Sequence, residues 1–210
     1  MSSQTRSEYL YTHAGSTGSD TYLWPALADV IAKLRPRGAA RVFDLGCGNG
    51  QVAGLLADAG LDVTGVDTSR SGIVVAAAAY PQCRFAVASA YEDLAARFGQ
   101  FPIVVSLEVV EHLSEPRHFA RTLFDLVEPG GTVIVSTPYH GYLKNLALAV
   151  TGRMDRHFTA LWDGGHIKFF SIATLRELLQ EAGFTPVTFV RVGRIPPLAK
   201  SMMAIATRPL

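Results

Sequence analysis

A glycine-rich turn and one aspartate form the first group of residues with chemical potential. The run VFDLGCGNG at residues 42–50 places glycines where an apolar strand pattern gives way to a helical one. At Gly46 and Gly48 the missing side chain permits a positive φ angle and lets a ligand approach the backbone. Asp67 ends the next apolar run, where a carboxylate can accept hydrogen bonds from both hydroxyls of a ribose. Together the loop and the acid predict a nucleoside site.

The residues at positions 44 and 51 distinguish this loop from the fingerprint of dinucleotide-binding proteins. The pattern GxGxxG needs a glycine at position 51, which is Gln51 in this chain. Asp44 comes just before the glycines, where it is poorly placed against a pyrophosphate but well placed to organise a site for a zwitterionic amino acid. The ligand is therefore better interpreted as an aminoacyl nucleoside than as NAD.

A group of acids and an imidazole follows a later apolar run. The sequence SLEVVEHL at residues 106–113 contains Glu108, Glu111 and His112, and in a helical turn Glu108 and His112 share a face. His112 is the predicted general base, because an imidazole titrates near neutrality; the alternative is a structural histidine that bonds a backbone group. The two acids orient the imidazole, hold a divalent cation, or only favour the dipole of a helix. No metal ligand set is assigned from the sequence.

The sequence GGHIKFFS at residues 164–171 supplies a second imidazole, His166. It is interpreted as a second acid–base group or substrate clamp, or equally as a hydrogen-bonded structural histidine. Phe169 and Phe170 are expected to anchor the core, and Ser171 to cap a helix that begins at residue 172. The preceding segment is rich in aromatic and histidine residues that suit an apolar acceptor but are also common in small satellite cores: Tyr139, His140, Tyr142 and Trp162.

Alternating strands and helices must position these groups. The apolar patterns predict strands at residues 41–45, 62–67, 84–87, 102–107, 132–136, 187–192 and 202–206, and helices at residues 51–59, 69–80, 91–97, 115–127 and 172–182. Strands separated by helices favour a parallel sheet covered on both faces. The last two strands are close enough for an antiparallel hairpin. The predicted fold is therefore an α/β, Rossmann-like, doubly wound sheet of seven mostly parallel strands with an antiparallel last strand.

One domain over residues 1–210 is expected, with residues 1–36 as an N-terminal cap segment and residues 139–170 as a lid insertion. Within the lid, the run at residues 146–150 suits one amphipathic helix. The run at residues 143–150 could also touch a membrane that holds the acceptor, so peripheral contact remains open.

Charge and composition exclude several functions. With 19 Lys and Arg against 18 Asp and Glu, the formal charge is +1, so nucleic acid is not an expected partner. No apolar run approaches the roughly 20 residues of a membrane span, and no signal sequence opens the chain, so a cytoplasmic protein is expected. Cys47 and Cys83 suggest neither a disulfide scaffold nor a zinc site. The oligomeric state is left open.

The order of five motifs resembles class I S-adenosylmethionine-dependent methyltransferases. DLGCGNG and GVD are followed by ASAYEDL at residues 88–94, SLEVVEHL at 106–113 and EPGG at 128–131. The acid–histidine run resembles the ubiquinone-biosynthesis type of O-methyltransferase and related small-molecule methyltransferases. It does not resemble the Asn/Asp-Pro-Pro-Tyr signature of enzymes that methylate the amino groups of bases.

The resemblance implies a role for each matched residue. Gly46 and its neighbours contact the methionine part, Asp44 orients the loop, and Asp67 holds the ribose hydroxyls. Thr68 lies against the adenine, although the family often has a larger apolar residue there, and an acid often stands where this chain has Ser89. The full implied cofactor set is Asp44, Gly46, Cys47, Gly48, Asn49, Asp67, Thr68, Ser89, Ala90, Tyr91 and Leu107.

The expected reaction is methyl transfer from S-adenosylmethionine to a small molecule, with S-adenosylhomocysteine as product. A hydroxyl oxygen of a phenol, quinol or natural product is the first choice and nitrogen the second; a non-catalytic S-adenosylmethionine-binding module is the third reading. His112, His166 and Glu108 are the expected catalytic residues. Glu111, Tyr139, His140 and Trp162 are expected to contact the substrate. With a catechol-like acceptor, a divalent cation would fit the two acids.

Overall fold

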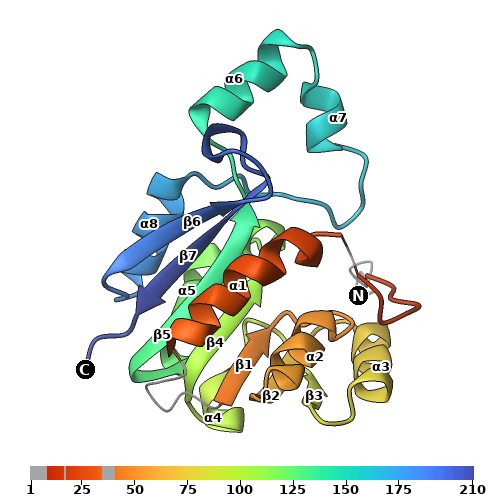
Figure 1. The fold of residues 1–210 in the computed structure, drawn as a ribbon, viewed down its shortest axis with the longest axis vertical. Helices are drawn as coiled ribbons and strands as arrows, with labels where there is room; N and C mark the ends of the chain where they lie inside the picture. Colours follow the sequence, from red (N-terminus) through yellow and green to blue (C-terminus); the bar gives the residue numbers. More distant parts are fainter. Residues whose placement is uncertain (1–8, 17, 35–40) are drawn as a thin grey trace, which may run out of the picture.

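A seven-stranded sheet forms the centre of the computed structural model, which describes residues 9–16, 18–34 and 41–210 (Figure 1). The strand order is β3-β2-β1-β4-β5-β7-β6. The strands are β1 (Arg41–Leu45), β2 (Asp62–Asp67), β3 (Arg84–Val87), β4 (Phe101–Leu107), β5 (Val127–Pro138), β6 (Val187–Val192) and β7 (Ser201–Thr207). The first five pair in parallel, and β7 is antiparallel to both β5 and β6. The predicted fold class is thus confirmed.

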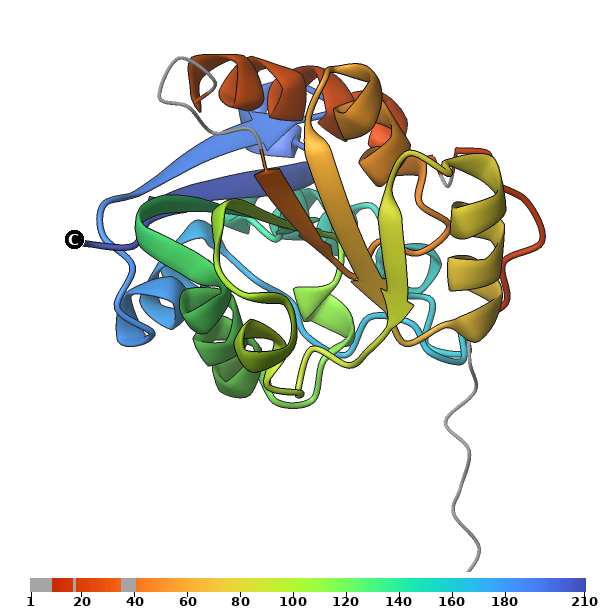
Figure 2. The ribbon, with the colours of Figure 1, turned by 90° about the horizontal axis from the view of Figure 1, so that it is seen from below.

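Helices cover both faces because consecutive strand residues point to opposite sides of the sheet. In β1, Val42 packs with Leu27 of α1, whereas Phe43 packs with Leu123 of α5. Figure 2 shows α1 and α2 on one face and α5 and α8 on the other. The helices are α1 (Asp20–Leu34), α2 (Gln51–Asp58), α3 (Arg70–Ala79), α4 (Leu94–Phe98), α5 (Pro116–Leu126), α6 (Tyr142–Val150), α7 (Met154–Phe158) and α8 (Ile172–Glu181), with short 3₁₀ turns η2 (Val110–His112) and η3 (Pro196–Leu198).

The elements agree with the expected ranges, with two main differences. The strand expected at residues 132–136 extends over Val127–Pro138, and the polar helix near residue 91 begins only at Leu94. Of the expected N-terminal cap, the described part contains α1, while residues 1–8, 17, 35 and 36 lie outside the described residues. Ser171 caps α8 as predicted: its hydroxyl accepts a hydrogen bond from the Thr174 amide at 3.3 Å.

The segment predicted as a lid contains two helices, α6 and α7, whereas the sequence suggested one helix. They stand beyond the carboxyl ends of the parallel strands (Figure 1), and neither has a buried residue. Helix α6 contacts η3, in the connection between β6 and β7. No helix among the described residues is long and apolar enough to cross a membrane.

Candidate active site

A cavity of about 1460 Å³ opens at the carboxyl ends of β1, β2 and β4, the edge at which open α/β sheets bind ligands. Its walls come from the glycine loop, the ends of β2 and β4, the lid, and the segment that begins at Tyr9. One drug-sized ligand occupies a pocket of roughly 300–1,000 Å³. The cavity therefore has room for a cofactor and a second molecule.

The glycine loop after β1 is shaped so that only glycine fits at two of its positions. Gly46 has a φ of 85°, and an added Cβ would lie 2.3 Å from a methyl group of Val109. Gly48 has a φ of 53°, and its Cβ would lie 2.6 Å from the hydroxyl of Tyr11. These glycines therefore allow Val109 and Tyr11 to pack closely against the loop, and both glycines line the cavity.

Asp67 at the end of β2 is held rigidly in the cavity wall. Its Oδ2 accepts a hydrogen bond from the Gly48 amide at 2.9 Å, and its Oδ1 accepts one from the Ser69 amide at 2.7 Å. A carboxylate offers about four acceptor positions, so the oxygens retain capacity for further donors such as ribose hydroxyls. A hydrogen-bond acceptor at this strand end fits the hydroxyls of a nucleoside.

Asp44 lies beneath the glycine loop and does not line the cavity. Its side chain is buried, and Oδ2 has no hydrogen-bond partner among the described residues. Burial, and secondly the charge of Asp67, raise the pKa of Asp44 to about 7. An orphaned carboxyl under the loop suits a ligand with a cationic amino group above it, and it acts through the loop because the loop separates it from the cavity.

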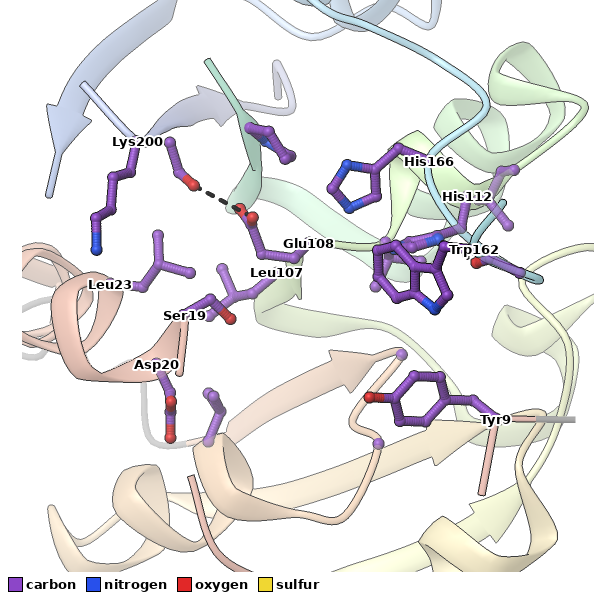
Figure 3. Close-up of a pocket in the computed structure, with 18 of the residues that line it drawn as sticks. Tyr9, Ser19, Asp20, Leu23, Leu107, Glu108, His112, Trp162, His166 and Lys200 are labelled. Carbon is purple, nitrogen blue, oxygen red and sulfur yellow. Dashed lines mark hydrogen bonds between the residues drawn. The ribbon is translucent and has the colours of Figure 1, made fainter. Parts of the chain in front are cut away.

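Glu111, His112 and His166 meet beside the cavity, on the side where Figure 3 shows the two histidines and Trp162. One ligand atom from each residue lies within 4.8 Å of the others. Glu111 is fully buried, and neither of its oxygens has a hydrogen-bond partner among the described residues. Burial, and secondly Glu108, raise the pKa of Glu111 well above its ordinary value.

The two histidines present lone pairs to this cluster. Nδ1 of His112 lies 2.9 Å from the Gly164 carbonyl, and since a carbonyl only accepts, Nδ1 carries a proton and Nε2 is the ring nitrogen left to face the cluster. Nε2 of His166 lies 4.0 Å from Oε1 of Glu111. Burial, and secondly His112, lower the pKa of His166 to about 4, so its imidazole is neutral near pH 7.

Glu108 differs from its predicted role. It has a φ of 55° directly after β4, and its carboxylate accepts hydrogen bonds from the hydroxyls of Ser136 at 2.8 Å and Ser201 at 3.2 Å. Residues 110–112 form a 3₁₀ turn, so Glu108 and His112 do not share a helical face. The expectation that Glu108 orients the His112 imidazole is wrong, because the Gly164 carbonyl does this.

Comparison with known proteins identifies the architecture around this cavity. The family model described as a methyltransferase domain matches residues 20–188, which include the glycine loop, Asp67 and the acid–histidine cluster. This chain belongs to the methyltransferase domain family. The predicted membership of the S-adenosylmethionine-dependent class is confirmed, and with it the cofactor.

Two curated relatives of this methyltransferase carry the same name. A ubiquinone biosynthesis O-methyltransferase of Azorhizobium caulinodans is 36% identical over 159 residues, which cover 72% of this chain and 61% of that protein. One from Ralstonia nicotianae is 34% identical over 170 residues, covering 77% of this chain and 70% of that protein. The match thus spans less than two thirds of the first relative's length.

A solved structure supports the same fold for the methyltransferase. The magnesium protoporphyrin IX methyltransferase of Synechocystis, with bound S-adenosylhomocysteine, superposes with a TM-score of 0.65 at 23% identity and covers 88% of this chain and 82% of that one. At that identity the likeness concerns the fold alone.

Most predicted cofactor residues of the methyltransferase line the cavity: Gly46, Cys47, Gly48, Asn49, Asp67, Thr68, Ser89, Ala90, Tyr91 and Leu107. Asn49 has an additional task, because its amide donates hydrogen bonds to the carbonyls of His13 and Gly15 at 3.0 and 2.9 Å. The individual contacts with the cofactor stay predictions.

Two of the four predicted substrate residues line the cavity and two do not. His140 and Trp162 line the cavity, whereas Tyr139 and Glu111 do not. Tyr139 packs against the core with Arg191 over its ring at 5.9 Å, and its contact with the substrate stays a prediction. Glu111 lies behind the two histidines.

Sequence reasoning missed the N-terminal segment as part of the site. The Ser69 hydroxyl donates to the Tyr9 carbonyl at 2.7 Å, and the Tyr11 amide donates to the Ser71 hydroxyl at 3.2 Å. Tyr9 faces the cavity opposite Trp162 (Figure 3). Burial, and secondly Asp67, raise the pKa of Tyr11 above its usual range. These tyrosines precede the first apolar pattern, so no periodicity marks them.

Proposed function

We propose that this methyltransferase transfers the methyl group of S-adenosylmethionine to a hydroxyl oxygen of a small molecule, with the acceptor activated by a divalent cation at Glu111, His112 and His166. The observation that supports this proposal most directly is the buried carboxyl group of Glu111, which has no hydrogen-bond partner among the described residues and lies behind two imidazoles. Two histidines and one carboxylate form a common set of ligands for divalent transition metals. The name of the curated relatives supports oxygen as the acceptor.

The spacing of the three residues fits one cation after a small adjustment. Ligands about 2.1 Å from a metal lie up to about 4.2 Å apart, close to the 4.8 Å within which the three atoms lie. The Gly164 carbonyl fixes the ring of His112 in the orientation that exposes Nε2. When bound, a cation would stabilise the deprotonated form of the acceptor hydroxyl.

The remaining residues position the reactants. The sulfonium of the bound cofactor supplies the methyl group, and displacement at a methyl carbon depends mainly on the alignment of the two reactants. Asp67 and the glycine loop hold one reactant, and the cluster and the lid hold the other. The ring of Trp162 lies 6.0 Å from His112 and 5.4 Å from His166, forming an apolar wall that suits a flat acceptor.

An alternative retains the earlier prediction that His112 is a general base without a metal. Methylation of nitrogen and a non-catalytic binding module are further alternatives. The exposed side chains of Tyr142, Leu143 and Val150 on α6 favour peripheral contact with a membrane, which liposome flotation tests. A cytoplasmic location and the absence of a nucleic-acid partner stay predictions.

Calorimetric titration with Mn²⁺ and Zn²⁺ tests the proposed cation. We expect one ion per chain in the wild type, none in Glu111→Gln, and normal binding in Glu115→Gln, which changes an exposed acid nearby. Methyl transfer to a catechol should stop in EDTA and return when the ion is added. No binding by the wild type, together with methylation that EDTA does not affect, would support the base mechanism instead.

A further inference from the structure

The lid side of the cavity carries an excess of positive charge. Four cations line it: Lys144, Arg153, Arg194 and Lys200. The carboxylates that line the same cavity are mostly engaged within the protein, since Asp20, Asp67 and Glu108 accept hydrogen bonds from neighbouring groups. Asp163 on the lid is the remaining acid in the described cavity wall.

Lys144 and Arg194 both line the cavity and lie near enough for the charge of Arg194 to act on Lys144. Lys144 extends from α6, and Arg194 belongs to the connection that leads to η3, which α6 contacts. Nζ of Lys144 donates hydrogen bonds to the carbonyl oxygens of Tyr139 at 2.8 Å and Lys200 at 3.4 Å. Arg194 has no hydrogen bond or ion pair with another described residue.

The charge of this pair is not balanced by the protein. Burial, and secondly Arg194, lower the pKa of Lys144 to about 8, while Glu108, whose effect is the smallest of the three, raises it. Lys144 and Arg194 also lower the pKa of His157, after burial. Like charges beside a partly buried wall repel one another, and an anion between them would remove that cost. Arginine also offers a planar fork of donors that matches carboxylate and phosphate groups.

We propose that Lys144 and Arg194 form a subsite for an anionic group, a carboxylate or a phosphate monoester, carried by the methyl acceptor. This inference rests on the proposed function, because it concerns the molecule that receives the methyl group. The anion binds at Lys144 and Arg194, and the reacting hydroxyl lies at the Glu111–His112–His166 cluster. Lys200, which supplies a carbonyl to Lys144, lies well apart from His112 in Figure 3.

An aromatic surface connects the two ends. The ring of His140 stacks on Phe158 at 5.6 Å and lies 5.0 Å from the ring of Phe169. All three residues line the cavity. Burial, and secondly Lys144, lower the pKa of His140 to about 4, so this imidazole adds no charge near pH 7. An aromatic body with a hydroxyl at one end and an anion at the other matches this order of surfaces.

Three matched catechols test the subsite: one with a neutral hydroxymethyl group, the phosphate monoester of that alcohol, and one with a carboxymethyl group. Their dissociation constants are measured by calorimetry with S-adenosylhomocysteine present, and their methylation is measured separately. The proteins are the wild type, Arg194→Ala, Lys144→Met and the control Arg121→Ala, which changes an exposed arginine on α5 outside the cavity.

We expect the wild type and Arg121→Ala to bind at least one anionic catechol about 10-fold or more tightly than the neutral one. Arg194→Ala and Lys144→Met should lose most of that preference and keep the affinity for the neutral catechol. The anionic catechol that binds more tightly shows whether the subsite prefers a carboxylate or a phosphate. Arg194 is exposed, so its variant tests the subsite even if Lys144→Met folds poorly.

Equal affinity of the wild type for charged and neutral catechols would overturn the subsite. A preference for the anionic catechols that survives in both Arg194→Ala and Lys144→Met would overturn it too, as would the failure of both anionic catechols to bind. Failure of the proposed function is a different result, in which the anionic catechol binds preferentially but is not methylated. That result supports the subsite and rejects the reaction.

Discussion

Oε1 of Glu111 lies 4.0 Å from Nε2 of His166, and within the described part of the chain neither carboxylate oxygen of Glu111 receives a hydrogen bond. Buried polar atoms are nearly always partnered, because an unmet group costs about 1–3 kcal/mol. The backbone around Glu111 is well satisfied, since its carbonyl accepts hydrogen bonds from the amides of Ile167 and Lys168. The side chain is thus held firmly in a position that a cation would complete.

Asp67→Ala should weaken the binding of S-adenosylhomocysteine without unfolding the protein. The ribose hydroxyls would lose charge-assisted hydrogen bonds worth roughly 1.5–3 kcal/mol each, which corresponds to at least about a 10-fold loss of affinity. Calorimetry measures this, with Asp62→Ala as the control at the opposite end of β2. Unchanged affinity in Asp67→Ala would remove this residue from the site.

His112→Ala and His166→Ala should keep their affinity for S-adenosylhomocysteine and lose most methyl transfer. Both residues act on the acceptor and not on the cofactor, and the loss of an activating group typically lowers a rate about 10²–10⁴-fold. Single-turnover assays with labelled cofactor measure the rate. Normal turnover in both variants would indicate an acceptor that is already nucleophilic, such as an unprotonated amine.

Asp44→Asn should stabilise the protein more at high pH than at low pH. Burial raises the pKa of Asp44 from 3.8 to about 7, so the folded state favours the protonated acid. Its contribution to stability is complete below pH 3.8 and is lost as the pH rises through about 7. The uncharged asparagine avoids this loss.

Denaturant melts at about pH 5 and about pH 8.5 compare the two proteins. Since one pKa unit corresponds to about 1.4 kcal/mol, the advantage of Asp44→Asn should grow by about 2–4 kcal/mol between them. A difference that does not change with pH would show that Asp44 titrates normally.

Amides of α6 and α7 should exchange hydrogen faster than those of the sheet, and more slowly once S-adenosylhomocysteine and a catechol are bound. Neither helix has a buried residue, so little packing opposes their opening. Hydrogen exchange with mass spectrometry compares residues 142–158 with β4 as the internal reference. Slow exchange in both regions, unaffected by ligands, would contradict the predicted mobile lid.

The sheet could be predicted from the sequence because short apolar runs, typical of strands buried on both faces, and glycine turns are local signals. Val42 and Phe43 alternate between the two cores, and Asp67 follows directly from the end of its strand. The direction of Glu108 was not predictable in this way, because a positive φ and the hydroxyls of Ser136 and Ser201 determine it. These contacts join residues far apart in the sequence.

Contacts between distant segments also explain why the proposed anion subsite was not predicted from the sequence. Lys144 and Arg194 come from distant segments, and their proximity depends on how α6 rests against η3. Glu111 and His112 are adjacent in sequence, yet one is buried behind the other because residues 110–112 form a tight 3₁₀ turn.

The hydrogen bonds from Asn49 to residues 13 and 15 also bear on how product leaves. Tyr9 and Tyr11 both line the cavity, and Tyr11 lies near enough to Asp67 for that carboxylate to raise its pKa, so this stretch forms part of the wall of the nucleoside site. We expect a bulky fusion partner attached ahead of Tyr9 to slow the release of product, and one attached after Leu210, which does not line the cavity, to leave it unaltered. Product-release rates measured with a tag at either end test this expectation.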